Sequence, residues 1–256
     1  MKVIFMIPKI IHYCWLSDDT YPENLVRCMN TWKEKLPDYE FKLWNFKNFK
    51  KNSSKWVSQA FDNKKYAFAA DFIRLYAIYN YGGIYLDMDI EVLKSFDDLL
   101  NQKVMIAYES DERIGLEAGC FGAEKGNHFI KDCLSHYDDR SFIKSDGSFD
   151  IVPLPIIMAG FLSGNPDVIP DDWHSFTNKS YKTGSVITTE NSYTVHHFAG
   201  SWTSMAQQKY DNLRKKLYLI FPQPLAKIIS FFPFIKWQII DNGFLGFCKK
   251  VFRRIF

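Results

Sequence analysis

The stretch YGGIYLDMDIEV, residues 81–92, decides the fold of this chain. Its Gly82–Gly83 pair is typical of the end of a helix, and the apolar run 84–86 predicts a buried strand. Asp87 and Asp89 follow directly, where the strand leaves the sheet. Hard cations such as Mg²⁺ or Mn²⁺ prefer oxygen ligands and leave positions open for phosphate oxygens. The stretch therefore predicts a carboxylate pair that holds a metal ion against a diphosphate.

The segments before this stretch alternate between strand and helix patterns. Residues 2–16 are β-rich and apolar, residues 21–35 carry apolar side chains at helical spacing, and residues 36–45 contain the alternation of a strand. Residues 64–80 form the clearest helix, which places Asp71 and Arg74 on one face. This order predicts an α/β fold.

Composition excludes several classes of protein. Hydrophobic residues make up 47% of the 256 residues and charged residues 24%, which is globular rather than disordered usage. The net charge of +3 does not indicate a nucleic-acid-binding polycation, so we expect no nucleic-acid partner. The apolar run 3–7 is too short for a signal peptide, and no run of about 18 uncharged apolar residues predicts a membrane span.

The cysteines indicate a reducing compartment. There are five, an odd number, without a C-x-x-C pair and at irregular spacing. This pattern favours neither a disulfide framework nor a zinc site. We expect free thiols in a cytoplasmic protein.

The charge and the aromatic residues concentrate in residues 207–256. This segment has ten Lys or Arg and two Asp, a net charge of +8, and eleven aromatic residues. We therefore expect a catalytic domain at 1–206 and a helical, basic and aromatic extension at 207–256. Pro222, Pro224 and Pro233 favour short helices that dock on the anionic inner face of the cell membrane. Packing on the catalytic domain or a dimer interface is the alternative.

Four segments occur in an order that resembles glycosyltransferase family 32, which includes capsular-polysaccharide sugar transferases and initiating mannosyltransferases. The resemblance extends more distantly to the catalytic domain of glucosylating bacterial toxins. The four segments are IPKIIHYCW (7–15), AADFIR (69–74), YGGIYLDMDIEV (81–92) and HHFAGSW (196–202). The resemblance implies a GT-A-type nucleotide-sugar-binding fold, which is a Rossmann-like mixed sheet flanked by helices. It also implies a nucleotide-sugar donor, a divalent metal (Mn²⁺ or Mg²⁺) and retention of the anomeric configuration.

The resemblance also implies roles for the helix and strand-end residues. Asp71, Arg74 and Asp87 are implied catalytic residues that also contact the donor, with Asp87 at the donor sugar or ribose. Asp89 is the implied metal and diphosphate ligand. A surface ion pair between Asp71 and Arg74 is the structural alternative.

The first and last segments supply further candidates. His12 and Trp15 are expected to line the nucleotide pocket, with core packing as the alternative, and Ser201 and Trp202 to close over the donor. Histidine is a good ligand for Mn²⁺. Of the adjacent pair His196 and His197, we expect His197 to lie on the metal side.

These observations predict a retaining, metal-dependent hexosyltransferase. It would move a sugar from a nucleoside diphosphate donor, UDP rather than GDP, to a hydroxyl of a lipid-linked surface-polysaccharide precursor for capsule, O-antigen or exopolysaccharide. Front-face and double-displacement routes both remain open. One alternative is a non-catalytic, membrane-associated glycan-binding protein. The other is a D-x-D phosphatase, which is disfavoured because Glu91 stands where that class has Thr or Val.

Overall fold

The computed structural model describes residues 7–180, 182–200, 205–218 and 220–255. The chain forms two compact units. The first comprises the chain up to Lys179 together with Val186–His197, and the second comprises Ser180–Ser185 together with the chain from Phe198 onward. The boundary expected at residue 206 falls inside a helix of the second unit, Met205–Tyr218.

The first unit contains a central mixed sheet. Its strands are β1 (Ile10–Cys14), β2 (Glu40–Trp44), β3 (Gly83–Leu86), β5 (Val104–Met105) and β6 (Cys120–Ala123), in the order β2-β1-β3-β6-β5. β1 is parallel to β2 and β3, whereas β6 is antiparallel to β3 and β5. A separate antiparallel ribbon pairs β4 (Ile90–Val92) with β7 (Thr194–His196). The mixed sheet expected from the sequence is confirmed.

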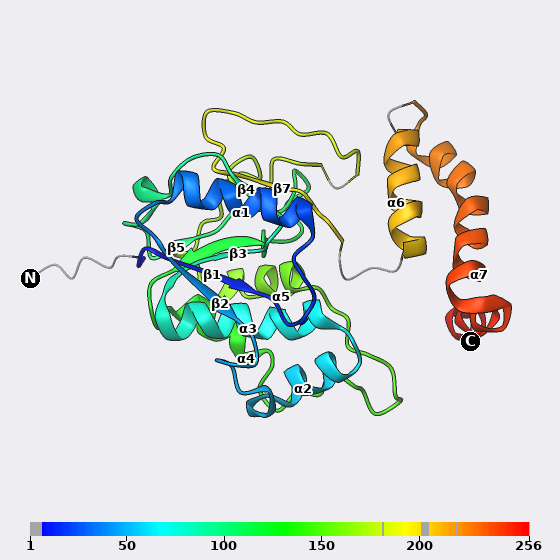
Figure 1. Cartoon of the computed structure of the whole chain (residues 1–256), viewed down its shortest axis with the longest axis horizontal. Coiled ribbons are helices and arrows are strands. Elements are labelled where there is room, and N and C mark those ends of the chain that lie inside the picture. Colours follow the sequence, from blue (N-terminus) through cyan, green and yellow to red (C-terminus); the bar gives the residue numbers. More distant parts are fainter. Residues whose placement is uncertain (1–6, 181, 201–204, 219, 256) are drawn as a thin grey trace, which may run out of the picture. The chain divides into compact units, whose positions relative to one another are not determined.

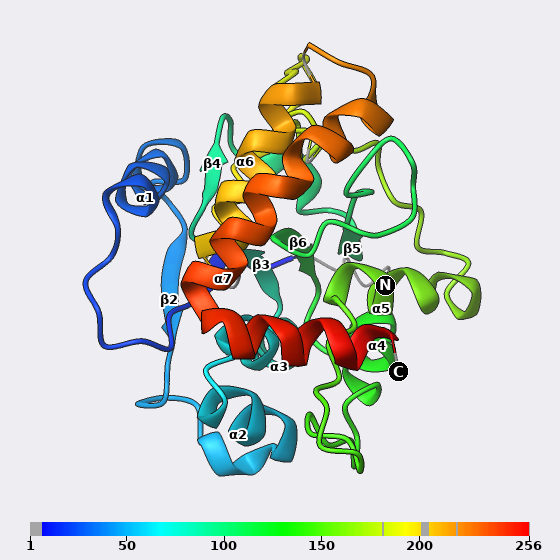
Figure 2. The same cartoon turned by 90° about the vertical axis from the view of Figure 1, so that its right-hand side faces the viewer.

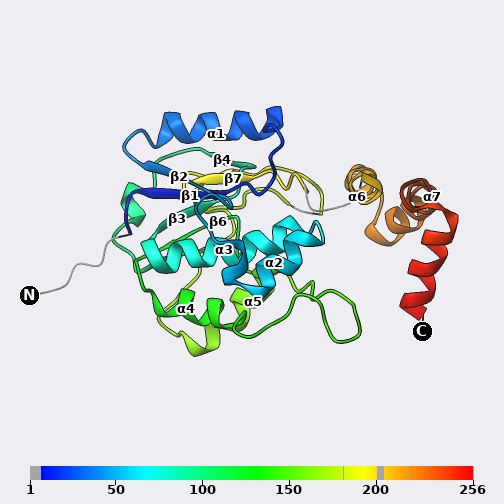
Figure 3. The same ribbon diagram turned by 60° about the horizontal axis from the view of Figure 1, so that its bottom comes forward.

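Helices cover both sides of this sheet. They are α1 (Glu23–Lys35), α2 (Lys55–Asp62), α3 (Tyr66–Tyr81), α4 (His128–Ser135) and α5 (Leu154–Gly160), with short 3₁₀ turns at Lys51–Ser53, Asp97–Leu99 and Leu162–Gly164. Figures 1 and 3 show α1 and the β4–β7 ribbon on one side of the sheet and α3, α4 and α5 on the other. α3 packs directly against β1 and β3, which brings its polar face near the end of β3.

Local sequence explains the helix ends that matter for the site. The α3 helix ends at Gly82, which adopts a φ of +67° that residues with a Cβ rarely adopt. A Cβ at Gly82 would also lie 2.8 Å from the backbone nitrogen of Lys125. The sequence expectation that Gly82 and Gly83 end this helix is confirmed. The helix α4 begins after Asn127, whose side chain caps it by accepting hydrogen bonds from the backbone nitrogens of Phe129 and Ile130.

The hydrophobic core lies mainly between α3 and the sheet and is rich in aromatic side chains. Trp56 packs edge-on against Tyr137 and Phe142, with ring centroids 4.9 and 5.1 Å apart. Its indole nitrogen donates to the backbone carbonyl of Phe68 at 2.8 Å, so the buried polar group is satisfied. Much of the high aromatic content of the chain therefore serves the core.

The second unit contains two packed helices, α6 (Met205–Tyr218) and α7 (Gln223–Ile255), which lie side by side in Figure 2. Pro233 lies inside α7, and Gly243, with a φ of +68°, interrupts it, so that α7 is two helices joined at a kink. The extension is helical, as expected, but the expectation that Pro233 divides it into short helices is wrong, because α7 continues through Pro233 to the kink at Gly243. Among the described residues, no helix is both long and apolar enough to cross a membrane.

Candidate active site

Asp87 and Asp89 lie between the end of β3 and the start of β4. In the antiparallel ribbon, Ile90 pairs with His196, which brings this histidine beside the two aspartates. Ligand atoms of Asp87, Asp89 and His196 all lie within 4.8 Å of one another. Nε2 of His196 is 3.6 Å from Oδ1 of Asp89. We refer to these three residues as the candidate metal site.

The donor set of this site fits a divalent cation. Two carboxylates and an imidazole suit Mn²⁺, and the carboxylates also suit Mg²⁺. The backbone leaves room for the side chains of His196, Glu117 and Asp87 because residue 119 is a glycine. A Cβ at Gly119 would lie 2.8 Å from Cε1 of His196, 2.9 Å from Oε1 of Glu117 and 3.1 Å from Oδ2 of Asp87. The small residue thus allows all three groups to converge.

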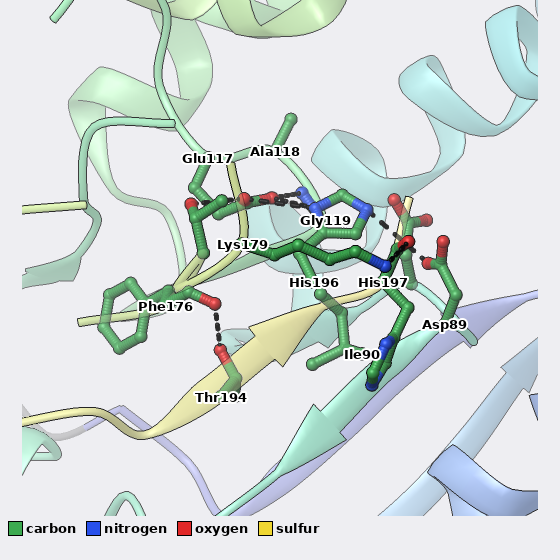
Figure 4. A network of polar contacts seen from close by, with 12 residues as sticks. Asp89, Ile90, Glu117, Ala118, Gly119, Phe176, Lys179, Thr194, His196 and His197 are labelled. Atoms are coloured by element: carbon green, nitrogen blue, oxygen red, sulfur yellow. Dashed lines mark hydrogen bonds and ion pairs between the residues drawn. The ribbon is translucent and has the colours of Figure 1, made fainter. Parts of the chain in front are cut away.

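Glu117 holds the ring of His196 in place. Its two carboxylate oxygens lie 3.0 and 3.1 Å from Nδ1 of His196. The same fully buried carboxylate accepts hydrogen bonds from the backbone of Gly119 and the hydroxyl of Thr177, each at 2.7 Å. Figure 4 shows the His196 ring between Glu117 and Asp89. With Nδ1 donating to Glu117, Nε2 is directed toward the aspartates.

Electrostatic interactions favour the charged forms of both Glu117 and His196. Burial opposes ionisation of Glu117, but His196 and the hydrogen bonds outweigh it, and the pKa of Glu117 lies below its usual value. Burial also opposes the charged form of His196, yet the carboxylates of Glu117 and Asp89 raise its pKa to about 10. Binding of a cation at Nε2 would displace that proton.

Arg74 connects α3 to the metal site. Its guanidinium lies 3.3 Å from Asp71 on the same helix and 3.1 Å from Oδ2 of Asp87. It also donates to the backbone carbonyl of Ala118 at 2.7 Å. The Arg74 side chain is 7% exposed, so this is a buried ion pair rather than the surface pair considered above. The structure therefore brings together Asp71, Arg74, Asp87 and Asp89, as the sequence predicted.

The two aspartates beside Arg74 are held in an environment that disfavours negative charge. Burial raises the pKa of Asp71 to about 7 despite the attraction of Arg74. Burial also raises the pKa of Asp87, and Arg74 opposes this rise. The hydroxyl of Tyr85 donates to Oδ1 of Asp87 at 3.0 Å. Both oxygens of Asp87 therefore have a fixed protein donor, which sets the orientation of its carboxylate.

His197 faces away from the aspartate side chains. Its Nε2 lies 2.8 Å from a carboxylate oxygen of Glu91, and its carbonyl accepts a hydrogen bond from Nζ of Lys179 at 2.7 Å. Its backbone nitrogen donates to the carbonyl of Asp89. The expectation that His197 is the metal-side histidine is corrected, because strand β7 directs His196 to the metal site and the next residue to the opposite side.

His12 lies in the core rather than at an open pocket. Its side chain is fully buried, and its Nε2 donates to the carbonyl of Gly82 at 2.8 Å. Its Nδ1 accepts a hydrogen bond from the indole of Trp44 at 3.0 Å. Burial lowers its pKa to about 4, which keeps the ring neutral. The ring therefore has no surface open to a nucleotide, and core packing, the alternative considered from the sequence, describes it.

Trp15 keeps an accessible position at the carboxyl end of β1. It is partly exposed and lies edge-on to Tyr21, with ring centroids 5.2 Å apart. Its indole nitrogen donates to the carbonyl of Asp19 at 3.1 Å. The expectation that Trp15 contacts the nucleotide stays a prediction. Ser201 and Trp202 lie outside the described residues.

Sequence reasoning missed the residues that surround the ligands. Glu117 and Gly119 belong to EAGCFGA (117–123), a segment in which the glycines but not the acid attract attention. A carboxylate among small and apolar residues is a usable signal, because buried acids are rare unless they are paired. Burial lowers the pKa of Lys179, and the charge of Asp89 opposes this effect. Lys179 lies in a polar loop, where nothing in the sequence distinguishes it from exposed lysines.

Comparison with known proteins places the metal-site loop in a glycosyltransferase region. Residues 22–106 match the family model described as glycosyltransferase sugar-binding region containing DXD motif. This range contains α3, Asp87 and Asp89. The resemblance to family 32 sugar transferases is confirmed.

Curated relatives share part of this sequence. The chain is 32% identical to inositol phosphoceramide mannosyltransferase 3 of Schizosaccharomyces pombe over 128 residues, covering 48% of this chain and 35% of the relative. It is 30% identical to the mannosyl phosphorylinositol ceramide synthase SUR1 of Saccharomyces cerevisiae over 148 residues, covering 54% of this chain and 37% of the relative. The chain thus spans less than half of the length of these relatives.

A solved structure shares the fold. The PaToxG glycosyltransferase superimposes with a TM-score of 0.50 over 63% of this chain and 71% of that chain, at 20% sequence identity. The expected GT-A-type architecture is confirmed by this likeness together with the mixed sheet.

Proposed function

We propose that this chain is a metal-dependent glycosyltransferase that moves a hexose from a nucleoside diphosphate sugar to a hydroxyl group. The observation that carries the proposal is the convergence of Asp87 and Asp89, which follow β3, with His196 on β7. The two aspartates lie inside residues 22–106, which match a glycosyltransferase family. A divalent cation held by these three residues would neutralise the diphosphate as it leaves.

The residues around the candidate metal site have separate roles in the proposed reaction. Arg74 and Tyr85 fix the carboxylate of Asp87, so that one side chain serves both the cation and the donor. Asp71, with its pKa near 7, can exchange hydrogen bonds with a sugar hydroxyl as donor or acceptor. The buried charge of Arg74 would stabilise a developing negative charge on the donor phosphate. Asp71 and Arg74 act from helix α3, and Asp87 acts from the short connection between β3 and β4.

We propose retention of configuration through a transition state with oxocarbenium character, as in glycoside hydrolysis. The support is the resemblance to family 32. Two routes are compatible with it. In one, the acceptor attacks from the face that the diphosphate leaves. In the other, a carboxylate of the enzyme forms a transient glycosyl bond. The anomeric configuration of the product and trapping of a glycosyl-enzyme distinguish the outcomes.

For the donor and acceptor we propose a UDP-sugar and a hydroxyl on a lipid-linked glycan, such as a precursor of a surface polysaccharide. The names of two relatives support the lipid character of the acceptor, because they describe mannosyl transfer to an inositol phosphoceramide. Because these names describe mannosyl transfer, GDP-mannose should be assayed as a donor beside UDP-glucose and UDP-galactose. A hydroxyl-bearing head group on a lipid is the chemistry that these acceptors share.

We propose a cytoplasmic location at the inner face of the cell membrane. The support is chemical: all four cysteines that the structure describes, Cys14, Cys28, Cys120 and Cys133, are free thiols. Free thiols are usual where glutathione and thioredoxin keep proteins reduced.

The test is an assay of donor hydrolysis and transfer with each nucleotide sugar, with Mn²⁺, with Mg²⁺ and with chelator. We expect turnover of one donor that requires the cation and disappears in Asp89→Asn. Cleavage of a phosphomonoester in place of the nucleotide sugar would indicate a phosphatase. Glycan binding without turnover of any donor would indicate a binding protein.

A further inference from the structure

The first helix of α7, residues 223–242, directs several of its large apolar side chains outward. Leu225, Ile228, Ile229 and Phe232 recur at helical spacing along one face. All four are exposed; Ile228 is 61% and Phe232 is 72% accessible. We refer to these four residues as the outer stripe.

The opposite face of the same helix is small or polar. Ala226 and Ser230 are fully buried and Gln238 is almost fully buried. These residues share a face with Phe234, whose ring lies 4.5 Å from that of Tyr210 in α6. The face that packs toward α6 is therefore the one with less apolar surface.

This arrangement is the reverse of that expected for a helix pair surrounded by water. Such a pair buries its large apolar residues between the helices and exposes its polar ones. The exposed apolar surface also continues into the turn before α7, where Ile220 is 72% accessible. Contiguous exposed apolar surface of this kind marks a site of interaction with a protein or a membrane.

The charges of the second unit indicate what kind of partner the outer stripe binds. Lys227 and Lys236 are exposed on the same helix as the outer stripe. Residues 207–256 together carry a net charge of +8. Lys236, four residues after Phe232, lies on the face of the outer stripe, whereas Lys227 lies toward the opposite face. An apolar stripe with a lysine at its end complements a surface that is apolar inside and negatively charged at its rim, which describes an anionic lipid bilayer. The stem of Lys236 can lie along the apolar surface while its ammonium group reaches the phosphates.

We propose that the outer stripe of α7 inserts into the interface of an anionic membrane, with Lys236 at the lipid phosphates. The helix lies in the plane of the surface, consistent with the finding that no described helix suits a membrane span. The inference is independent of the proposed catalytic activity, because it concerns lipid binding by the second unit.

The test is flotation of the full chain with vesicles of phosphatidylcholine alone or mixed with phosphatidylglycerol, at low and high salt. We expect the wild type to bind the anionic vesicles, with binding weakened by salt. Phe232→Asp and, independently, Ile228→Asp should each lower the bound-to-free ratio about tenfold or more, because each removes an inserted apolar side chain. The variant Lys236→Glu should also lower binding, and its effect should shrink at high salt.

Matched controls are Ile169→Asp and Lys50→Glu, which change an even more exposed isoleucine and an exposed lysine of the first unit. Both should bind vesicles like the wild type. Absence of vesicle binding by the wild type, or equal losses in the controls, would overturn the proposal. So would a Phe232→Asp variant whose main effect is dissociation of a wild-type dimer or a lower melting temperature, since the stripe would then be a protein interface.

Discussion

Glu117 and His196 are 79 residues apart in the chain, and yet both oxygens of the Glu117 carboxylate lie within 3.1 Å of Nδ1 of His196. This carboxylate–histidine pair directs Nε2 of the ring toward Asp89. The pair resembles the outer-shell partners that orient ligating histidines in many metal sites. It therefore offers a way to test the metal site without removing a ligand.

Glu117→Gln should weaken Mn²⁺ binding by about 10- to 100-fold, because a neutral amide supports the ligating tautomer of His196 less well. Isothermal titration with Mn²⁺ measures the effect. Glu91→Gln is the matched control, since Glu91 contacts His197 and not the metal site. Equal losses in both variants would contradict the assignment of His196.

Asp89→Asn should lower transfer by about 100-fold or more, because it removes a charged ligand from the group that holds the cation. The melting temperature should change little, since Asp89 follows β3 at a strand end rather than in the core. Steady-state rates with saturating Mn²⁺ and thermal denaturation check both parts. Asp146→Asn, in an exposed loop, serves as the control, and full activity of Asp89→Asn in chelator would refute the role.

Arg74→Lys should lower both kcat/KM and stability. A lysine cannot contact Asp71, Asp87 and the Ala118 carbonyl at the same time, and it leaves a buried carboxylate poorly paired. We expect a loss of about 3 kcal/mol in the free energy of unfolding, measured with urea. Arg140→Lys changes a more exposed ion pair with Asp150 and should cost much less. A variant that keeps its activity but melts earlier would assign Arg74 to stability alone.

Gly119→Ala should disturb the metal site without disturbing the core. The added methyl group would approach His196 and Asp87 to within the distances at which side chains must shift. We expect Mn²⁺ affinity to fall severalfold while the circular dichroism spectrum stays unchanged. Gly160→Ala is the matched control, because a Cβ at Gly160 would meet nothing within 4 Å. Unchanged Mn²⁺ affinity in Gly119→Ala would show that the candidate metal site can accommodate the added methyl group.

His12 should make stability depend on pH. Burial lowers the pKa of His12 to about 4 in the folded protein, whereas an exposed histidine has a pKa of about 6.5. Between these values the unfolded chain binds a proton that the folded chain does not. Stability is therefore present above pH 6.5 and is lost as the pH falls toward 4, by about 3 kcal/mol in total.

Urea unfolding at several pH values, compared between the wild type and His12→Gln, isolates this contribution. The difference in unfolding free energy between the two proteins should shrink as the pH decreases from 7 to 4. A difference that stays constant over this range would show that His12 does not stay neutral in the fold.

The sequence predicts the part of the site that local patterns encode. Asp71 and Arg74 share a face because they are three residues apart on a helix, and Asp87 follows an apolar strand. Both relationships depend on neighbours in the chain. The choice between His196 and His197 does not, because adjacent strand residues point to opposite sides and only the register of β7 against β4 decides which one meets Asp89.

The positions of His12 and Glu117 show the same limit. A histidine within an apolar strand pattern is equally compatible with a pocket and with the core. Its burial follows from the contact with Trp44 across the sheet and with Gly82 beyond α3, which are long-range partners. Glu117 likewise acquires its role only when Thr177 and His196 reach it. Tertiary contacts of this kind carry no local signature.

The pairing of β4 with β7 has a consequence for synthesis of the chain. Asp87 and Asp89 leave the ribosome long before His196, and β4 stays without its partner strand until residues 194–196 are made. A nascent or truncated chain that stops before β7 has the D-x-D motif but lacks the third ligand of the cation. The ribbon thus delays full metal-binding capacity until nearly the whole first unit has been translated.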